Sequence, residues 1–143
     1  MIARAALLAA AATLSAAAAP LPDASLTVRV SNVRNAHGRV HVDVCPQRSF
    51  LKDDCPYSAQ SPAVAGTTIV VVRGVPAGRY AVQAFHDENA NGRVDRAFFG
   101  IPKEGVGFSN DAPIHLSPPK WDAAMFAVDG TAQTIQLKLR YFL

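Results

Sequence analysis

The sequence has few charges, and this shortage already limits what the protein can do. Only 17% of its 143 residues are charged, and the formal net charge is +3. No cluster of Lys or Arg compensates, so the chain lacks the basic surface typical of nucleic-acid-binding proteins. Sustained helical periodicity of apolar residues is also missing after the N-terminal region. These absences argue against nucleic acid as a partner and against a helical bundle as the fold.

Short motifs for nucleophilic and redox chemistry are missing too. The chain contains no Gly-x-Ser-x-Gly nucleophile elbow and no Cys-x-x-Cys pair. Its two cysteines, Cys45 and Cys55, have nine residues between them. Two cysteines in an oxidising compartment usually form a disulfide, and a metal-binding or redox pair is the alternative. We expect the disulfide.

Long apolar runs are confined to the N-terminus. Residues 1–19 combine one basic residue, Arg4, with an apolar run over residues 5–14 and small residues at the end. This order is typical of an export signal, and the run is too short for a good membrane span. Cleavage after Ala18 is favoured because Pro20 is a poor first mature residue; a retained N-terminal anchor is the alternative. The pattern predicts a periplasmic or secreted protein with one domain over residues 20–143.

Alternation of apolar and polar residues predicts β-strands. Residues 25–33, 39–45 and 133–141 carry an apolar side chain at every second position, which is typical of strands with one buried face. The segment between the first two contains Gly38, which suits the left-handed position of a turn. We therefore expect the first two strands to pair as a β-hairpin.

Three further segments complete the predicted strands. Residues 67–73 include a continuous β-branched run, which indicates a strand covered on both faces or a central strand. Residues 79–86 and 121–128 are also predicted as strands, whereas the proline-containing residues 46–66 are predicted to be irregular. Six or seven short strands separated by turns predict an all-β fold, an antiparallel β-sandwich of about seven strands.

One loop carries most of the chemistry visible in the sequence. Asp87, Asn89 and Asn91 stand at alternate positions, followed by Gly92 and, at the ninth position, Asp95. Alternate spacing lets a curling chain direct several oxygen atoms at one point, and Ca²⁺ takes six to eight oxygen ligands. A glycine at the sixth position allows the sharp turn of such a loop. The pattern predicts a structural calcium site.

The predicted coordination is incomplete. An EF-hand loop ends with a bidentate Glu at its twelfth position, where this chain has Phe98. Glu104, Asp111 or water would have to supply the missing ligands. The alternative is an Asx-rich turn without a cation, since Asn, Asp and Gly are common in turns. The predicted ligands are Asp87, Asn89, Asn91, the carbonyl of Arg93, Asp95 and Glu104.

Two motifs resemble known families. Residues 76–80, Pro-Ala-Gly-Arg-Tyr, resemble the Pro-x-Gly-x-Tyr signature of prealbumin-like sandwiches, including the B-type repeats of bacterial surface adhesins. Residues 86–92 and 100–110, with Asp95 between them, look like the exported bacterial family called domain of unknown function 2141 (DUF2141). The resemblance implies an exported β-sandwich without an established role. In the adhesin repeats, the similar loop binds calcium.

These observations leave several functions open. A non-enzymatic envelope module with an unknown protein or glycan partner is expected first. A small periplasmic hydrolase, or a metal-dependent enzyme on a transthyretin-like scaffold, is the second hypothesis. The third is a carbohydrate- or peptide-binding subunit that uses exposed aromatic side chains. The candidate surface for the third consists of Phe98, Phe99, Phe108 and Trp121.

Overall fold

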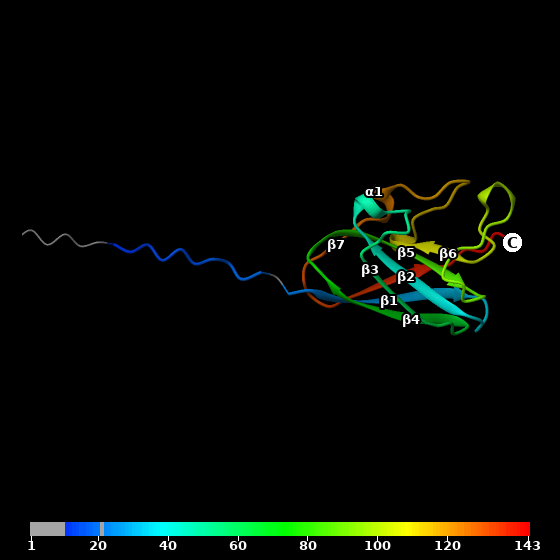
Figure 1. Cartoon of the computed structure of the whole chain (residues 1–143), viewed down its shortest axis with the longest axis horizontal. Helices are drawn as coiled ribbons and strands as arrows, with labels where there is room; N and C mark the ends of the chain where they lie inside the picture. The colour runs from blue at the N-terminus through cyan, green and yellow to red at the C-terminus, as the bar shows by residue number, and fades with distance from the viewer. Residues whose placement is uncertain (1–10, 21) are drawn as a thin grey trace, which may run out of the picture.

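The fold is a sandwich of two β-sheets, as the computed structural model of residues 11–20 and 22–143 shows (Figure 1). One sheet has the strand order β4-β1-β8, and the other has the order β3-β2-β5-β6, with β7 also paired to β5. The all-β sandwich predicted from the sequence is confirmed. The strands are β1 (Ala24–Val33), β2 (Arg39–Cys45), β3 (Tyr57–Pro62), β4 (Gly66–Val75), β5 (Gly78–Asp87), β6 (Val106–Phe108), β7 (Phe126–Val128) and β8 (Gln133–Lys138).

Short helical turns lie in the connections between strands. The single α-helical turn is α1 (Trp121–Ala124), and the 3-10 turns are η1 (Gln47–Ser49), η2 (Phe98–Gly100) and η3 (Ser109–Asp111). No helix in the described ranges has the length and apolar composition needed to cross a membrane. Residues 11–20 are exposed and have no regular secondary structure. The first ten residues of the predicted export signal lie outside the described residues.

The core lies between the two sheets, where the alternating valines and leucines of facing strands meet. Leu26, Val28 and Val30 of β1 are fully buried, and so are Val40 and Val42 of β2. Because side chains on a strand alternate between faces, the polar residues between them point outward. This buried layer supplies most of the apolar area that stabilises the sandwich.

The first two strands do not form the predicted hairpin. β1 pairs with β4 and, in parallel, with β8, whereas β2 pairs with β3 and β5. The connection through Gly38 therefore crosses from one sheet to the other. Alternation predicts only that both strands bury one face, and a connection between sheets satisfies that requirement as well as a hairpin does.

Three other predictions about the strands were wrong. β4 lies at a sheet edge and exposes Ile69 by 47% and Val71 by 37%, so it is not covered on both faces. Residues 121–128 form α1 followed by the short β7, not one strand. β3 lies within the segment predicted to be irregular, and its last residue, Pro62, is at the outer edge of its sheet, where a missing N–H group is tolerated.

A second, smaller apolar cluster covers the outer face of β2 and β5. Cys45, Phe50 and Ala81 pack there with Ala112, which follows η3, and with Ala124 of α1. The predicted disulfide is present, with Cys45 bonded to Cys55 at an S–S distance of 2.01 Å. It fastens the segment that carries Phe50 to the end of β2, and so it keeps this cluster in place.

Replacing both cysteines by alanine should destabilise the protein by about 2.5–3 kcal/mol, because the closed loop restricts the unfolded chain. Urea unfolding of the wild type and the Cys45→Ala/Cys55→Ala variant measures the difference. The wild type under reducing conditions serves as the control and should approach the variant. Equal stability of the oxidised wild type and the variant would contradict a structural role for the bond.

Candidate functional site

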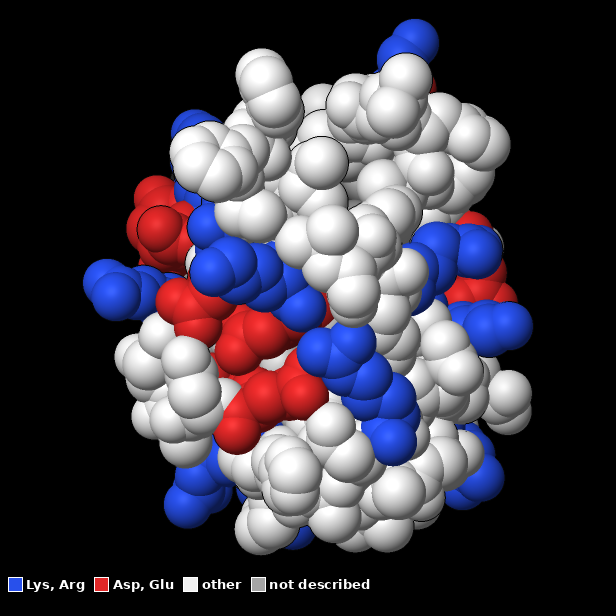
Figure 2. Space-filling view, turned by 90° about the vertical axis from the view of Figure 1, so that its right-hand side faces the viewer, with Lys and Arg blue, Asp and Glu red and all other residues white. Residues whose placement is uncertain are grey.

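The candidate site occupies the end of the sandwich where β5 runs into the loop of residues 87–95. Figure 2 looks onto the side of the molecule that faces right in Figure 1, and acidic side chains gather there in one patch bordered by Lys and Arg. The carboxylates at this end of β5 and in its loop include Asp87, Glu88, Asp95 and Glu104. The positions of their oxygen atoms decide what the site can bind.

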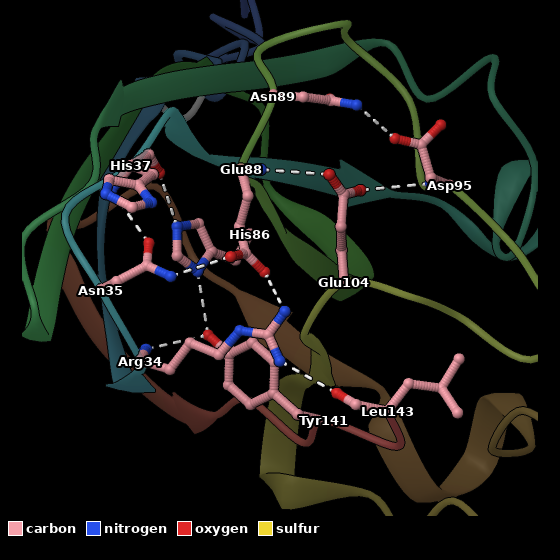
Figure 3. A network of polar contacts seen from close by, with 10 residues as sticks. All are labelled: Arg34, Asn35, His37, His86, Glu88, Asn89, Asp95, Glu104, Tyr141 and Leu143. Atoms are coloured by element: carbon pink, nitrogen blue, oxygen red, sulfur yellow. Dashed lines mark hydrogen bonds and ion pairs between the residues drawn. The ribbon is translucent and has the colours of Figure 1, made fainter.

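The last residues of β5 are fixed by a buried histidine. The His86 side chain is fully buried, and its Nε2 donates to the carbonyl oxygen of His37 at 2.7 Å (Figure 3). The Tyr141 hydroxyl accepts from the Arg34 N–H at 3.1 Å and donates to His86 Nδ1 at 3.0 Å. Both ring nitrogens therefore have partners, and these contacts join the turn after β1, the end of β5 and the C-terminal segment.

Charged groups beside this histidine reinforce the same junction. Arg34 pairs with the Glu88 carboxylate, and its guanidinium lies 4.5 Å from the centre of the Tyr141 ring. Asn35 Nδ2 donates to Glu88 Oε2 at 2.8 Å. The residues of this network, His86 included, were not predicted as site residues. No local sequence motif could show this network, because Arg34 and Glu88 are 54 positions apart in the sequence.

Asp87 shapes the loop from inside. Its side chain is 2% exposed. Oδ1 accepts from the N–H of Asn91 at 3.0 Å, and Oδ2 accepts from the N–H of Gly92 at 2.8 Å. Gly92 has φ +79°, which permits the sharp turn predicted at this position. The first predicted ligand thus organises the loop backbone around one carboxylate.

Glu104 closes the base of the loop. Its carboxylate accepts from the N–H of Glu88 at 3.1 Å and from the N–H of Asp95 at 3.2 Å, so it bridges both sides of the loop (Figure 3). The pKa of Glu104 is raised, mainly because the carboxylate is buried. The backbone hydrogen bond from Asp95 lowers this pKa, whereas the negative charge of the Asp95 side chain raises it further. A buried carboxylate held between like charges would gain from a nearby cation.

Asp95 forms the outer part of the site with the two predicted amide ligands. Asn89 Nδ2 donates to Asp95 Oδ2 at 2.6 Å, and Asn91 Nδ2 donates to the same carboxylate at 2.9 and 3.0 Å. The hydrogen bonds from Asn91 and then Asn89 lower the pKa of Asp95. Three predicted ligand residues therefore converge on one point.

The donor set fits a cation, although not through carboxylates alone. Among the described residues, no three His, Cys, Asp or Glu side chains are grouped to hold a metal ion. Oxygen atoms from amides must therefore contribute. Rotation of each Asn amide by 180° would turn its oxygen toward Asp95, and it would give up the hydrogen bonds that Asn89 Oδ1 and Asn91 Oδ1 accept from backbone N–H groups. Ligands of one Ca²⁺ lie roughly 3 Å from each other. The contacts of 2.6–3.0 Å around Asp95 match that spacing.

Arg93 was predicted to contribute only its carbonyl oxygen, and its side chain lies largely in solvent. Its side chain is 80% exposed, and its Nε lies 3.8 Å from Asp95 Oδ1. Its N–H donates to Asn91 Oδ1 at 3.1 Å, an Asx-type contact that stabilises the turn. The guanidinium partly balances the Asp95 charge from solvent and is free to turn away from it.

The four aromatic residues predicted as a binding surface do not form one. Phe98 and Phe99 are 90% and 101% exposed. Phe108 and Trp121, by contrast, pack edge-to-face against Phe50 in the second apolar cluster, with ring centroids 6.0 and 5.8 Å away. Only the first pair is available to a partner.

Replacing Gly38 by alanine should disrupt the junction around His86. A Cβ atom at Gly38 would lie 1.9 Å from the carbonyl oxygen of Asp87, so the turn and the end of β5 would have to separate. Gly74→Ala is the matched control, because Gly74 has a similar φ of +71° but nothing within 4 Å of the added atom. We expect a loss of about 1 kcal/mol for the control and at least about 3 kcal/mol for Gly38→Ala, measured by thermal unfolding. Equal losses would show that the close approach is unimportant.

Replacing Glu88 by glutamine should weaken the fold only where the carboxylate is ionised. Burial alone would raise the pKa of Glu88, but hydrogen bonds from Arg34 and Asn35 outweigh it and hold that pKa below its ordinary value. A lowered pKa in the folded state stabilises the fold above the ordinary value of 4.5, and this stabilisation is lost as the pH falls through the folded-state pKa.

We therefore expect Glu88→Gln to lower the free energy of unfolding by up to about 1 kcal/mol at pH 7, because the pair is partly exposed. Urea unfolding between pH 3 and pH 7 should show the difference from the wild type shrinking toward acid pH. A difference that does not change with pH would contradict the ionic contribution.

Comparison with known proteins supports one assignment. Neither a curated protein nor a solved structure matches the chain significantly. A family model matches residues 28–136, a range that begins in β1, ends in β8 and contains the whole loop between β5 and β6. The protein therefore belongs to the bacterial family described as uncharacterized protein conserved in bacteria (DUF2141).

Proposed function

We propose that this protein is an exported, non-enzymatic β-sandwich module of the bacterial envelope, in which a structural Ca²⁺ orders the segment after β5. The observation that carries the proposal is the convergence of Asn89, Asn91 and Asp95 at 2.6–3.0 Å. Asp87 and Glu104 lie behind these residues and hold the loop backbone in the curled shape that a calcium loop needs.

Charge supports a divalent ion at this place. Glu88 is paired with Arg34, so the carboxylates of Asp87 and Asp95, with Glu104 at the base of the loop, face one guanidinium, that of Arg93. Each oxygen of Asp87 accepts one backbone hydrogen bond, and a carboxylate oxygen has a second lone pair. Binding would use oxygens of Asp87, Asn89, Asn91 and Asp95, and water would complete the six to eight ligands. Affinity is expected at the weak, extracellular end of the calcium range, with Kd on the order of 10⁻⁵–10⁻³ M.

A structural role is favoured over an enzymatic one by how the polar side chains are used. Both nitrogens of His86 and the hydroxyl of Tyr141 are committed to contacts within the protein. A general base must reach a substrate proton with a free lone pair. These residues instead join distant segments of the chain, which is what a stable module requires.

Calcium should raise the thermal stability of the protein purified from the periplasm. The intact mass of that protein should show that the export signal has been removed. At ten times the Kd, binding adds RT ln 11, about 1.4 kcal/mol, which shifts the Tm by roughly 5 °C for a domain of this size. The Asp95→Asn variant should lose this shift, because it removes the carboxylate on which both amides converge. Asp53→Asn makes the same charge change at an exposed position and is the matched control.

The measurement is a melt in millimolar Ca²⁺ against a melt in chelator, combined with calorimetric titration. Identical melts of the wild type in both buffers, without a heat of binding, would identify the loop as an Asx-rich turn. A periplasmic mass that still includes Met1 would contradict the export part of the proposal.

A further inference from the structure

A rigid finger extends the candidate site away from the sandwich. The finger consists of residues 95–103. The Lys103 N–H donates to the Asp95 carbonyl and the Ala97 N–H to the Ile101 carbonyl, both at 2.8 Å. Arg96 Nη1 donates to the carbonyl oxygen of Gly100 at 2.9 Å, directly beneath the tip. These bonds, with Glu104 at the base, give the finger a defined shape.

The tip of the finger presents two phenylalanines to solvent. Phe98 and Phe99 are 90% and 101% exposed, so neither gains from packing within the chain. Phe99 also has φ +62°, a left-handed conformation that is rare for a bulky residue. A strained backbone that displays unpacked apolar side chains points to a partner outside the chain.

The charges around the tip are basic. The exposed side chains of Arg93, Arg96 and Lys103 flank it in the sequence, whereas Asp95 is engaged by the amides of Asn89 and Asn91. Over residues 93–103, three basic residues and one acidic residue give a net charge of +2. Apolar side chains at a tip with cations behind them match the order of layers in a membrane surface, where acyl chains lie beneath anionic headgroups.

We propose that the finger binds the surface of a bilayer that contains anionic phospholipids. Phe98 and Phe99 enter the boundary between headgroups and acyl chains, and the three basic side chains contact lipid phosphates. A pocket with convergent polar groups would favour a small-molecule ligand instead, and Phe98 and Phe99, exposed by 90% and 101%, line no such pocket. The proposal does not depend on calcium.

Vesicle cosedimentation tests this proposal with the processed protein, in chelator and low salt. Wild type should sediment with vesicles of phosphatidylcholine and phosphatidylglycerol at 7:3, and the Phe98→Ser/Phe99→Ser variant should bind at least tenfold more weakly. Arg93→Gln/Lys103→Gln should weaken binding to the same vesicles by about fivefold for each charge removed. This charge variant should bind pure phosphatidylcholine as weakly as wild type does.

Ile69→Thr is the matched control, because it removes exposed apolar surface from the opposite sheet and keeps the β-branched shape. Its binding should equal that of wild type, and circular dichroism should show that every variant is folded. The proposal is overturned if wild type does not sediment with anionic vesicles, even if it binds a glycan or another protein. Unchanged binding of the folded Phe98→Ser/Phe99→Ser variant would also overturn it.

Discussion

The hydrogen bonds of the buried His86 ring join parts of the chain that lie far apart in sequence. Through the His37 carbonyl they reach the turn that crosses between the sheets, and through the Tyr141 hydroxyl they reach the segment after β8. An unpaired buried imidazole would carry a desolvation cost, so the three segments are held together as one unit. The position of the loop after β5 follows from this junction, because Asp87 is the next residue.

The carboxylates of this region lie at different depths. Those that fix the shape of the loop are more deeply buried than Asp95. Asp87 and Glu104 are buried and accept backbone N–H groups, so they define the curl and the base of the loop without a cation. The Asp95 carboxylate is more exposed, and it contacts the side-chain amides of Asn89 and Asn91 and the Arg93 guanidinium. A cation would therefore change contacts at the rim of the loop and add to the backbone hydrogen bonds that already hold the finger.

Sequence patterns predicted the sandwich, the disulfide and the position of the loop, because each depends on local periodicity or spacing. They did not predict how β1 pairs, since alternation identifies a buried face but not the neighbouring strand. Contact between Arg34 and Glu88, and between His86 and Tyr141, depends on the tertiary arrangement and has no local signature. Glu104 stays a predicted ligand, and the sequence did not show that its carboxylate accepts backbone hydrogen bonds from both sides of the loop.

The parallel pairing of β1 with β8 has a consequence for the order in which the fold can form during synthesis. Leu26 of β1 lies opposite Gln133 of β8, and 133 minus 26 places these partners 107 residues apart. β1 therefore lacks one of its two neighbours until almost all of the chain is made, and contacts between such distant residues form slowly. The three-stranded sheet therefore cannot be completed until the last strand has been made.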